Sequence, residues 1–145
     1  MNVILKQATE EHLSRIVNLL KENNLPSEDI PSKMNYLFLG YAGSQFVGIG
    51  GLEIHENYGL LRSLTVEEPA RGQGYGKAIC MKLIDYAKEK RILKIYLLTE
   101  TAQAFFAKLN FEKIDRNTAP PAIQKTAEFA TLCPDSAVCM MLELD

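Results

Sequence analysis

Three alternate glycines between an apolar run and a helical run most restrict what this chain can fold into. The segment reads Arg71-Gly72-Gln73-Gly74-Tyr75-Gly76-Lys77, follows the apolar run 60–66, and leads into an amphipathic run that ends at Lys90. Glycines without side chains let backbone N–H groups close around a phosphate, and a helix N-terminus adds positive potential. Arg71 and Lys77 can add charge-assisted contacts. The pattern predicts an anion site; a glycine-rich helix start without a ligand is the alternative.

Two familiar nucleotide loops do not fit this spacing. The ATP-binding loop needs Gly-x-x-x-x-Gly-Lys-Ser/Thr, but Arg71 stands at its first glycine and Ala78 at its hydroxyl position. The dinucleotide loop needs Gly-x-Gly-x-x-Gly, and Lys77 occupies the place of its third glycine. The ligand we expect is therefore a phosphate compound that binds through neither of these two loops.

Length and composition narrow the class of protein. With 145 residues, 47% hydrophobic and 23% charged, we expect one globular domain over 1–145. A net charge of −2 gives no basic face for nucleic acid, and no apolar run is long enough for a membrane span. The first residues lack a signal peptide's pattern, so we expect a cytoplasmic protein. Three cysteines without a Cys-x-x-Cys pair give no reason to expect a metal.

The order of the expected elements gives the fold class. Tight turns make the first four strands antiparallel neighbours, whereas the strand that follows the long helix should run parallel to 60–66 by the right-handed crossover rule. The expected class is α+β, with a mixed, mostly antiparallel central sheet and helices on both faces. We expect strands at 3–7, 36–41, 46–55, 60–66, 94–99, 111–114 and 137–144, and helices at 9–23, 27–32, 76–90, 102–109 and 121–131. Asn110 is the expected left-handed cap of the helix 102–109.

The glycine segment matches Arg/Gln-x-x-Gly-x-Gly/Ala, and with the order of elements it resembles the GCN5-related N-acetyltransferase (GNAT) superfamily over the whole chain. The resemblance implies the three-layer GNAT fold, in which parallel strands 4 and 5 splay apart around acetyl-CoA. The Leu64 backbone N–H would then serve as the catalytic donor to the developing oxyanion. The implied contacts to acetyl-CoA are Leu64, Thr65, Val66, Arg71, Gly72, Gln73, Gly74, Tyr75, Gly76, Lys77, Thr101 and Phe106.

Two positions depart from the superfamily's catalytic pattern. Phe106 stands where a tyrosine often serves as general acid, and Leu98 stands where some relatives have a glutamate base. Glu53, on the neighbouring strand, is the candidate general base; a solvent-facing glutamate is the alternative. Arg62 either pairs with Glu53 or binds an acidic group of the substrate. Thr101 is either a helix cap or a ligand contact.

The segment 120–138 is unusual for a generic acetyltransferase and resembles the arsenic-resistance and amino-acid N-acetyltransferase subgroup. It implies direct transfer of an acetyl group to the primary amine of a small molecule, an amino acid or an analogue of one, arsenic-related compounds included. Arg62, Ser63 and Glu128 are the expected substrate-binding residues, and Cys133 is expected to be a packing residue. The alternatives are a peptide or protein N-acetyltransferase and a catalytically silent CoA-binding sensor. Homodimer formation is left open.

Overall fold

The computed structural model describes residues 2–144, which build a seven-stranded mixed sheet in the order β1-β2-β3-β4-β5-β7-β6. Every neighbouring pair is antiparallel except β4 and β5, which run parallel. This is the fold class that the element order predicted. The strands are β1 Ile4–Gln7, β2 Leu37–Ala42, β3 Gln45–His55, β4 Tyr58–Val66, β5 Lys94–Thr99, β6 Glu112–Ile114 and β7 Val138–Glu143.

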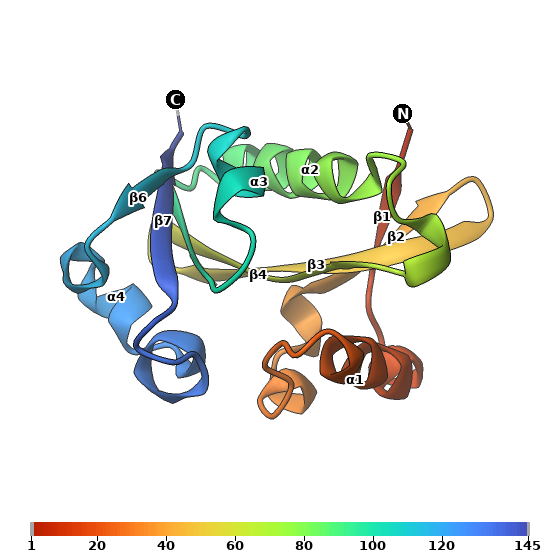
Figure 1. The fold of residues 1–145 in the computed structure, drawn as a ribbon, viewed down its shortest axis with the longest axis horizontal. Helices are drawn as coiled ribbons and strands as arrows, with labels where there is room; N and C mark the ends of the chain where they lie inside the picture. Colours follow the sequence, from red (N-terminus) through yellow and green to blue (C-terminus); the bar gives the residue numbers. More distant parts are fainter. Residues whose placement is uncertain (1, 145) are drawn as a thin grey trace.

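The parallel strands β4 and β5 pair over only a short stretch. Their register joins Tyr58 with Lys94 and ends where Leu60 meets Tyr96, although both strands continue beyond that point. The sheet therefore opens between the end of β4 and the end of β5. Figure 1 shows the consequence, because β7 and its neighbours turn steeply away from the plane of β3 and β4. The predicted splay of strands 4 and 5 is confirmed.

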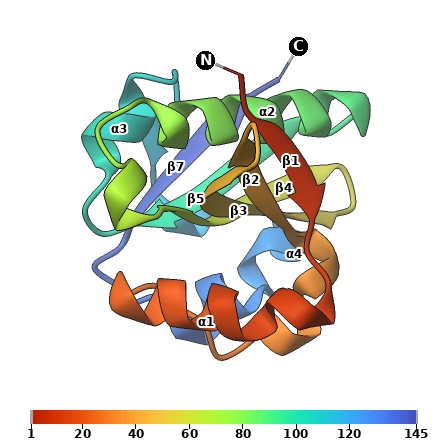
Figure 2. The same ribbon diagram turned by 90° about the vertical axis from the view of Figure 1, so that its right-hand side faces the viewer.

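Helices cover both faces of this sheet. α2 (Tyr75–Glu89) and α3 (Gln103–Ala107) lie on one face, and α1 (Leu13–Glu22) and α4 (Pro121–Gln124) lie on the other (Figures 1 and 2). α2 packs closely on β3 because Gly50 has no side chain: a Cβ there would lie 2.8 Å from Leu83 Cδ1. The result is a three-layer molecule with a separate apolar core on each side of the sheet.

Two predicted helices are wrong in extent. The helix expected at 27–32 is a pair of short 3₁₀ turns, Ile30–Ser32 and Met34–Tyr36, because so short a segment containing a proline gives too few hydrogen bonds to propagate a helix. The helix expected at 121–131 starts on Pro121 as predicted but ends at Gln124. A π-helical turn, Glu128–Leu132, follows it.

The sequence predicted most other elements to within two residues at either end. The strand 94–99 matches β5, and Asn110 has the left-handed backbone (φ 72°) expected of a helix cap. Among residues 2–144, no helix is both long and apolar enough to span a membrane.

Candidate functional site

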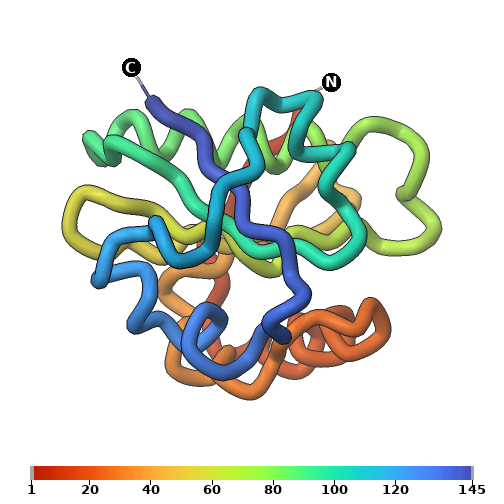
Figure 3. Tube along the Cα trace, turned by 60° about the vertical axis from the view of Figure 1, so that its left-hand side comes forward, coloured from red at the N-terminus to blue at the C-terminus, as the bar shows by residue number. Residues whose placement is uncertain are grey.

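One cavity of about 790 Å³ fills the opening between β4 and β5. Its wall takes the last part of each strand, the end of α1, the glycine turn, α3, and the segment that contains the π-helical turn. Figure 3 shows the segment after α4, in blue, on the same side of the sheet as the orange N-terminal segment. The cavity therefore runs from the glycine turn to the place where these two segments meet the sheet.

The glycine turn borders the cavity through Arg71 and Gly76. Gly72 (φ 79°) and Gly74 (φ 86°) adopt left-handed backbone, which glycine enters without strain, and α2 begins directly afterwards at Tyr75. The first N–H groups of α2 have no partner within the helix, so they remain donors for an anion. The turn thus has the backbone geometry that the sequence predicted for a phosphate site.

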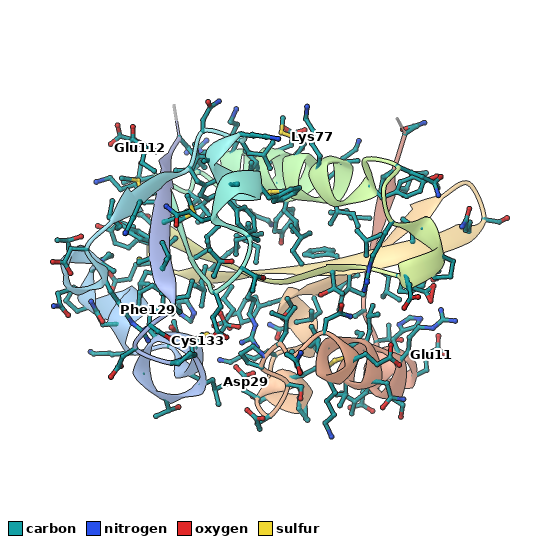
Figure 4. The ribbon with its side chains drawn as sticks, viewed as in Figure 1. Glu11, Asp29, Lys77, Glu112, Phe129 and Cys133 are labelled. Carbon is teal, nitrogen blue, oxygen red and sulfur yellow. The ribbon has the colours of Figure 1, made fainter. Side chains whose placement is uncertain are left out.

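The side chains around the turn are placed differently from one another. Arg71 Nε donates to the Val66 carbonyl oxygen (3.0 Å) and Arg71 Nη2 to Asn23 Oδ1 (2.7 Å). Arg71 therefore ties the turn to β4 and to the end of α1. Lys77 is exposed on the outer side of α2 (Figure 4). Of the predicted loop contacts, Arg71 and Gly76 line the cavity, whereas Gly72, Gln73, Gly74, Tyr75 and Lys77 do not.

A β-bulge shapes β4 where it borders the cavity. Gly51 pairs with Arg62 and Ile49 with Thr65, so two residues of β4 oppose Gly50 alone. Ser63 accordingly has a left-handed backbone (φ 61°). A bulge leaves one residue out of the ladder, and β5 has already diverged here. Leu64, Thr65 and Val66 all line the cavity.

The helix that the superfamily often uses for an acid carries only apolar groups at the cavity. Phe106 is 7% exposed, lines the cavity, and packs its ring edge-on against Phe105 and Phe111 at centroid distances of 5.0 and 5.6 Å.

Thr101 does not cap α3, which was one of its two predicted roles. The Ala102 N–H donates to Thr99 Oγ1 (3.0 Å) instead, so Thr101 is left exposed on the cavity wall.

A cluster of charged side chains surrounds Arg62 at the other end of the cavity. Arg62 Nη1 donates to Asp29 Oδ2 (2.5 Å) and to Glu53 Oε2 (2.7 Å), and Nη2 donates to Asp29 Oδ1 (2.7 Å). Arg62 Nε donates to Ser63 Oγ (3.2 Å) and lies 3.4 Å from Glu128 Oε2. Four segments of the chain thus bring three carboxylates to one buried guanidinium, which we call the Arg62 cluster: Asp29, Glu53, Arg62 and Glu128.

Within the Arg62 cluster, Glu53 is not on the cavity wall. It is 1% exposed, and its Oε1 is 2.8 Å from His55 Nε2 and 3.9 Å from Lys33 Nζ. Both carboxylate oxygens therefore face basic groups. Of the two readings of Arg62, pairing with Glu53 is the one that the geometry shows. The alternative of a solvent-facing Glu53 is wrong, because its strand directs the side chain toward Arg62 and His55. A role of Glu53 as general base stays a prediction, and Glu53 lies off the cavity wall.

Glu128 does reach the cavity. It is 4% exposed and lines the wall together with Arg62 and Ser63. Burial raises the pKa of its carboxyl to about 7; Arg62 opposes this rise, and the nearby Glu53 and Asp29 add to it. The sequence named Glu128 as substrate-binding but gave no sign of its altered pKa, because the turn that buries it interrupts an apparently regular helical pattern.

Cys133 also lines the cavity but is not placed as a nucleophile. Burial, followed by the charge of Glu128, raises the pKa of its thiol to about 12. The thiolate is the reactive form of cysteine, so this thiol is inert near neutral pH. Figure 4 shows Cys133 and Asp29 in the layer below the sheet. No group of three or more metal-ligating side chains occurs within 2–144.

Comparison with known proteins identifies the family of domains to which the chain is similar. The model of the acetyltransferase (GNAT) family matches residues 4–111. The match ends before the π-helical turn, so it includes the glycine turn and the strands β4 and β5 but not Glu128.

Solved structures agree on the fold. N-acetylglutamate synthase from Neisseria gonorrhoeae, crystallised with coenzyme A and L-arginine, has a TM-score of 0.82 and 18% identity, covering 98% of this chain and 33% of the synthase. This chain thus spans about a third of that protein's length. A GNAT acetyltransferase from Staphylococcus aureus has a TM-score of 0.78 and 21% identity, covering 99% and 100% of the two chains.

A third structure, the ribosomal-protein-S18-alanine N-acetyltransferase from Escherichia coli, has a TM-score of 0.75 and 15% identity, covering 99% of this chain and 95% of that one. Such identities establish the common fold and leave the acceptor unspecified. The family match covers most of the chain. The chain belongs to the GNAT family of acetyltransferases.

Proposed function

We propose that this chain is an acetyl-CoA-dependent N-acetyltransferase that acetylates the primary amine of a small molecule, an amino acid or an analogue of one. The observation that carries the proposal is a single cavity with two unlike ends. One end offers backbone donors at a glycine turn, and the other offers the Arg62 cluster. An acyl donor and a charged acceptor can therefore meet between β4 and β5.

We propose that acetyl-CoA binds at the end of the cavity beside the glycine turn. A diphosphate suits the N-terminus of α2 and the left-handed glycines before it. A pantetheine arm suits the gap beside Leu64, Thr65 and Val66, where the backbone N–H and C=O groups of β4 are not paired with β5. The Leu64 N–H is our candidate for the oxyanion donor. Gly72, Gln73, Gly74, Tyr75 and Lys77 remain proposed loop contacts, and Thr101 and Phe106 proposed wall contacts.

The acceptor end favours a cationic amine over an anionic group. The Arg62 cluster holds three carboxylates against one guanidinium, and Asp29 and Glu53 already occupy the two Nη atoms. A substrate carboxylate would have to displace Asp29 from a bidentate contact, which is costly for a buried pair. We therefore propose that the carboxylates of the cluster receive the ammonium of an amino acid, and that the carboxylate of the amino acid does not bind Arg62.

A small molecule suits the covered end of the cavity better than a peptide. The segment after α4 lies over the acceptor end, and Glu128, Cys133 and Ala137 contribute to its wall. It is held in place by Arg116, whose Nη1 and Nη2 donate to the carbonyl oxygens of Pro134 (2.8 Å) and Phe129 (2.6 Å). The proposed acceptors include arsenic-bearing analogues of amino acids. A cytoplasmic location and a homodimer remain predictions.

Direct attack by the amine is the proposed route, because the thiol at the cavity has a pKa raised to about 12 and so gives no acyl-enzyme nucleophile. The test is thiol release from acetyl-CoA by the purified chain across a panel of amino acids, polyamines and short peptides. We expect amino acids or their analogues to accelerate release and peptides not to do so. If acetyl-CoA binds but no amine accelerates release, the chain is a silent CoA-binding protein and the proposal is wrong.

A further inference from the structure

We infer that Glu128 accepts the proton of the acceptor's ammonium group during acetyl transfer, and that Arg62 is the residue that positions it. This inference rests on the proposed function and adds to it the group that performs the proton transfer. The geometry that points to Glu128 is its place on the cavity wall beside the bulge of β4, where the acyl group of the donor is expected.

The backbone around Glu128 is built to present this side chain. α4 stops at Gln124, where Thr126 Oγ1 donates to the Ile123 carbonyl oxygen (2.7 Å) and so ends the regular ladder. The next turn is π-helical, with the Cys133 N–H donating to the Glu128 carbonyl oxygen (3.0 Å). Single π-helical turns are frequent at functional sites because they redirect side chains within a helical segment. Here the turn sends Glu128 toward the cavity.

The Glu128 carboxylate retains acceptor capacity that its neighbours lack. Glu53 and Asp29 each accept short hydrogen bonds from Arg62. Within residues 2–144, the Glu128 carboxylate accepts no hydrogen bond, and its contact with a basic group is an ion pair with Arg62 Nε at 3.4 Å. Arg62 therefore fixes the place of the carboxylate without occupying it. An ammonium donor entering the cavity would satisfy the remaining oxygen.

Glu128 takes a proton from the ammonium before the N–C bond forms. One N–H bond of the ammonium breaks, its electron pair stays on nitrogen, and the proton moves to a Glu128 oxygen. The amine nitrogen then bonds to the acyl carbon, the C–S bond breaks, and the sulfur leaves with its electron pair. The second proton of the nitrogen goes to that thiolate, which gives free CoA thiol and the acetylated amine. Glu128 returns its proton to water through the cavity.

Electrostatics agree with the geometry. Burial holds the pKa of the Glu128 carboxyl at about 7, where a base can both take and release a proton near neutral pH. The charged and titratable groups that face it are Arg62 on β4, Glu53 on β3, Asp29 from the N-terminal segment, and Cys133 on its own segment. Lys33 and His55 face Glu53 behind them, and Arg116 lies behind Cys133.

The test compares the pH dependence of kcat/KM in three variants with the best acceptor of the wild-type chain. Glu128→Gln removes the proposed base, Glu53→Gln removes the buried partner of Arg62, and Glu112→Gln removes an exposed glutamate of β6. We expect wild type and Glu112→Gln to rise with pH through a limb near 7. We expect Glu53→Gln to keep such a limb but at lower pH, because Glu53 no longer raises the pKa of Glu128. We expect Glu128→Gln to lose that limb and roughly 100-fold of kcat/KM at pH 7, a usual size for general base catalysis.

The outcomes separate the two levels of proposal. If no amine accelerates thiol release from wild type, the proposed function fails and the role of Glu128 falls with it. If wild type turns over but Glu128→Gln keeps both the rate and the limb, or Glu53→Gln is the variant that loses them, only the Glu128 inference is overturned.

A second measurement needs neither an acceptor nor a folded variant. Carbon NMR of glutamate-labelled wild type should show one carboxyl that titrates near pH 7 and that responds to acetyl-CoA binding. If every glutamate carboxyl instead titrates below about pH 5, near the ordinary range, the inference is wrong.

Discussion

The two ends of the cavity differ in whether backbone or side-chain groups form them. The donor end is made of backbone: a turn with left-handed glycines, the N-terminus of α2, and two strands that stop pairing after Leu60. The acceptor end is made of side chains, with Asp29, Glu53, Arg62 and Glu128 arriving from four separate segments. A backbone site can serve any acetyl-CoA enzyme of the family, whereas a side-chain cluster can differ between members, so the second end is where specificity can reside.

Replacing Arg62 by methionine should give the largest effect, because it removes the buried cation that Asp29, Glu53 and Glu128 share. We expect a loss of about 3–5 kcal/mol in the free energy of unfolding, measured by urea denaturation at pH 7. Lys94→Met is the matched control, because its pair with Glu143 lies at the surface (3.9 Å) and should cost about 1 kcal/mol or less. Equal stability of the two variants would show that the Arg62 cluster does not hold the acceptor end together.

Glu128→Gln should change how stability depends on pH. The folded-state pKa of about 7 lies above the ordinary value, so the folded chain binds more protons than the unfolded chain between these values. Wild type therefore loses stability as pH rises through this window, and the glutamine variant is spared that loss.

From pH 4 to pH 8 the variant should gain roughly 2–3 kcal/mol relative to wild type, as thermal or urea unfolding would measure. Glu112→Gln, at an exposed position, should differ from wild type by a constant amount over the same range. A constant difference for Glu128→Gln as well would contradict the buried, ionisable carboxyl described here.

Gly72→Asp should weaken the donor end alone. Aspartate tolerates left-handed backbone, and no atom lies within 4 Å of the added Cβ, but its charge would repel a diphosphate. We expect the dissociation constant of acetyl-CoA to rise about tenfold, or ~1.4 kcal/mol. The control is Gly43→Asp in the β2–β3 turn, which has a similar backbone (φ 61°) and equally open surroundings. Similar affinity of both variants would place the diphosphate elsewhere.

Phe106→Tyr should give the smallest effect. It adds a hydroxyl at the cavity wall where relatives often have an acid, but the thiol of CoA is acidic enough to leave without one. We expect kcat to stay within about threefold of wild type, which is less than 1 kcal/mol in the barrier. A rise of more than tenfold in steady-state turnover would show that departure of the thiolate limits the rate.

The same division decides what the sequence could predict. The glycine spacing and the alternation of strands are local, so the turn, β5 and the left-handed Asn110 follow from short stretches of residues. The Arg62 cluster joins positions 33 residues apart on one side and 66 on the other, and no local pattern encodes such contacts. The π-helical turn was missed because residues 121–131 read as one helix, and that error hid the burial of Glu128.

Acetyl-CoA affinity, measured by titration calorimetry on wild type, Gly72→Asp and Glu128→Gln, tests the separation of the two ends most directly. We expect Glu128→Gln to bind acetyl-CoA within about twofold of wild type and Gly72→Asp to bind it about tenfold more weakly. Loss of affinity in Glu128→Gln as large as that in Gly72→Asp would contradict it, because the carboxylate would then belong to the donor site.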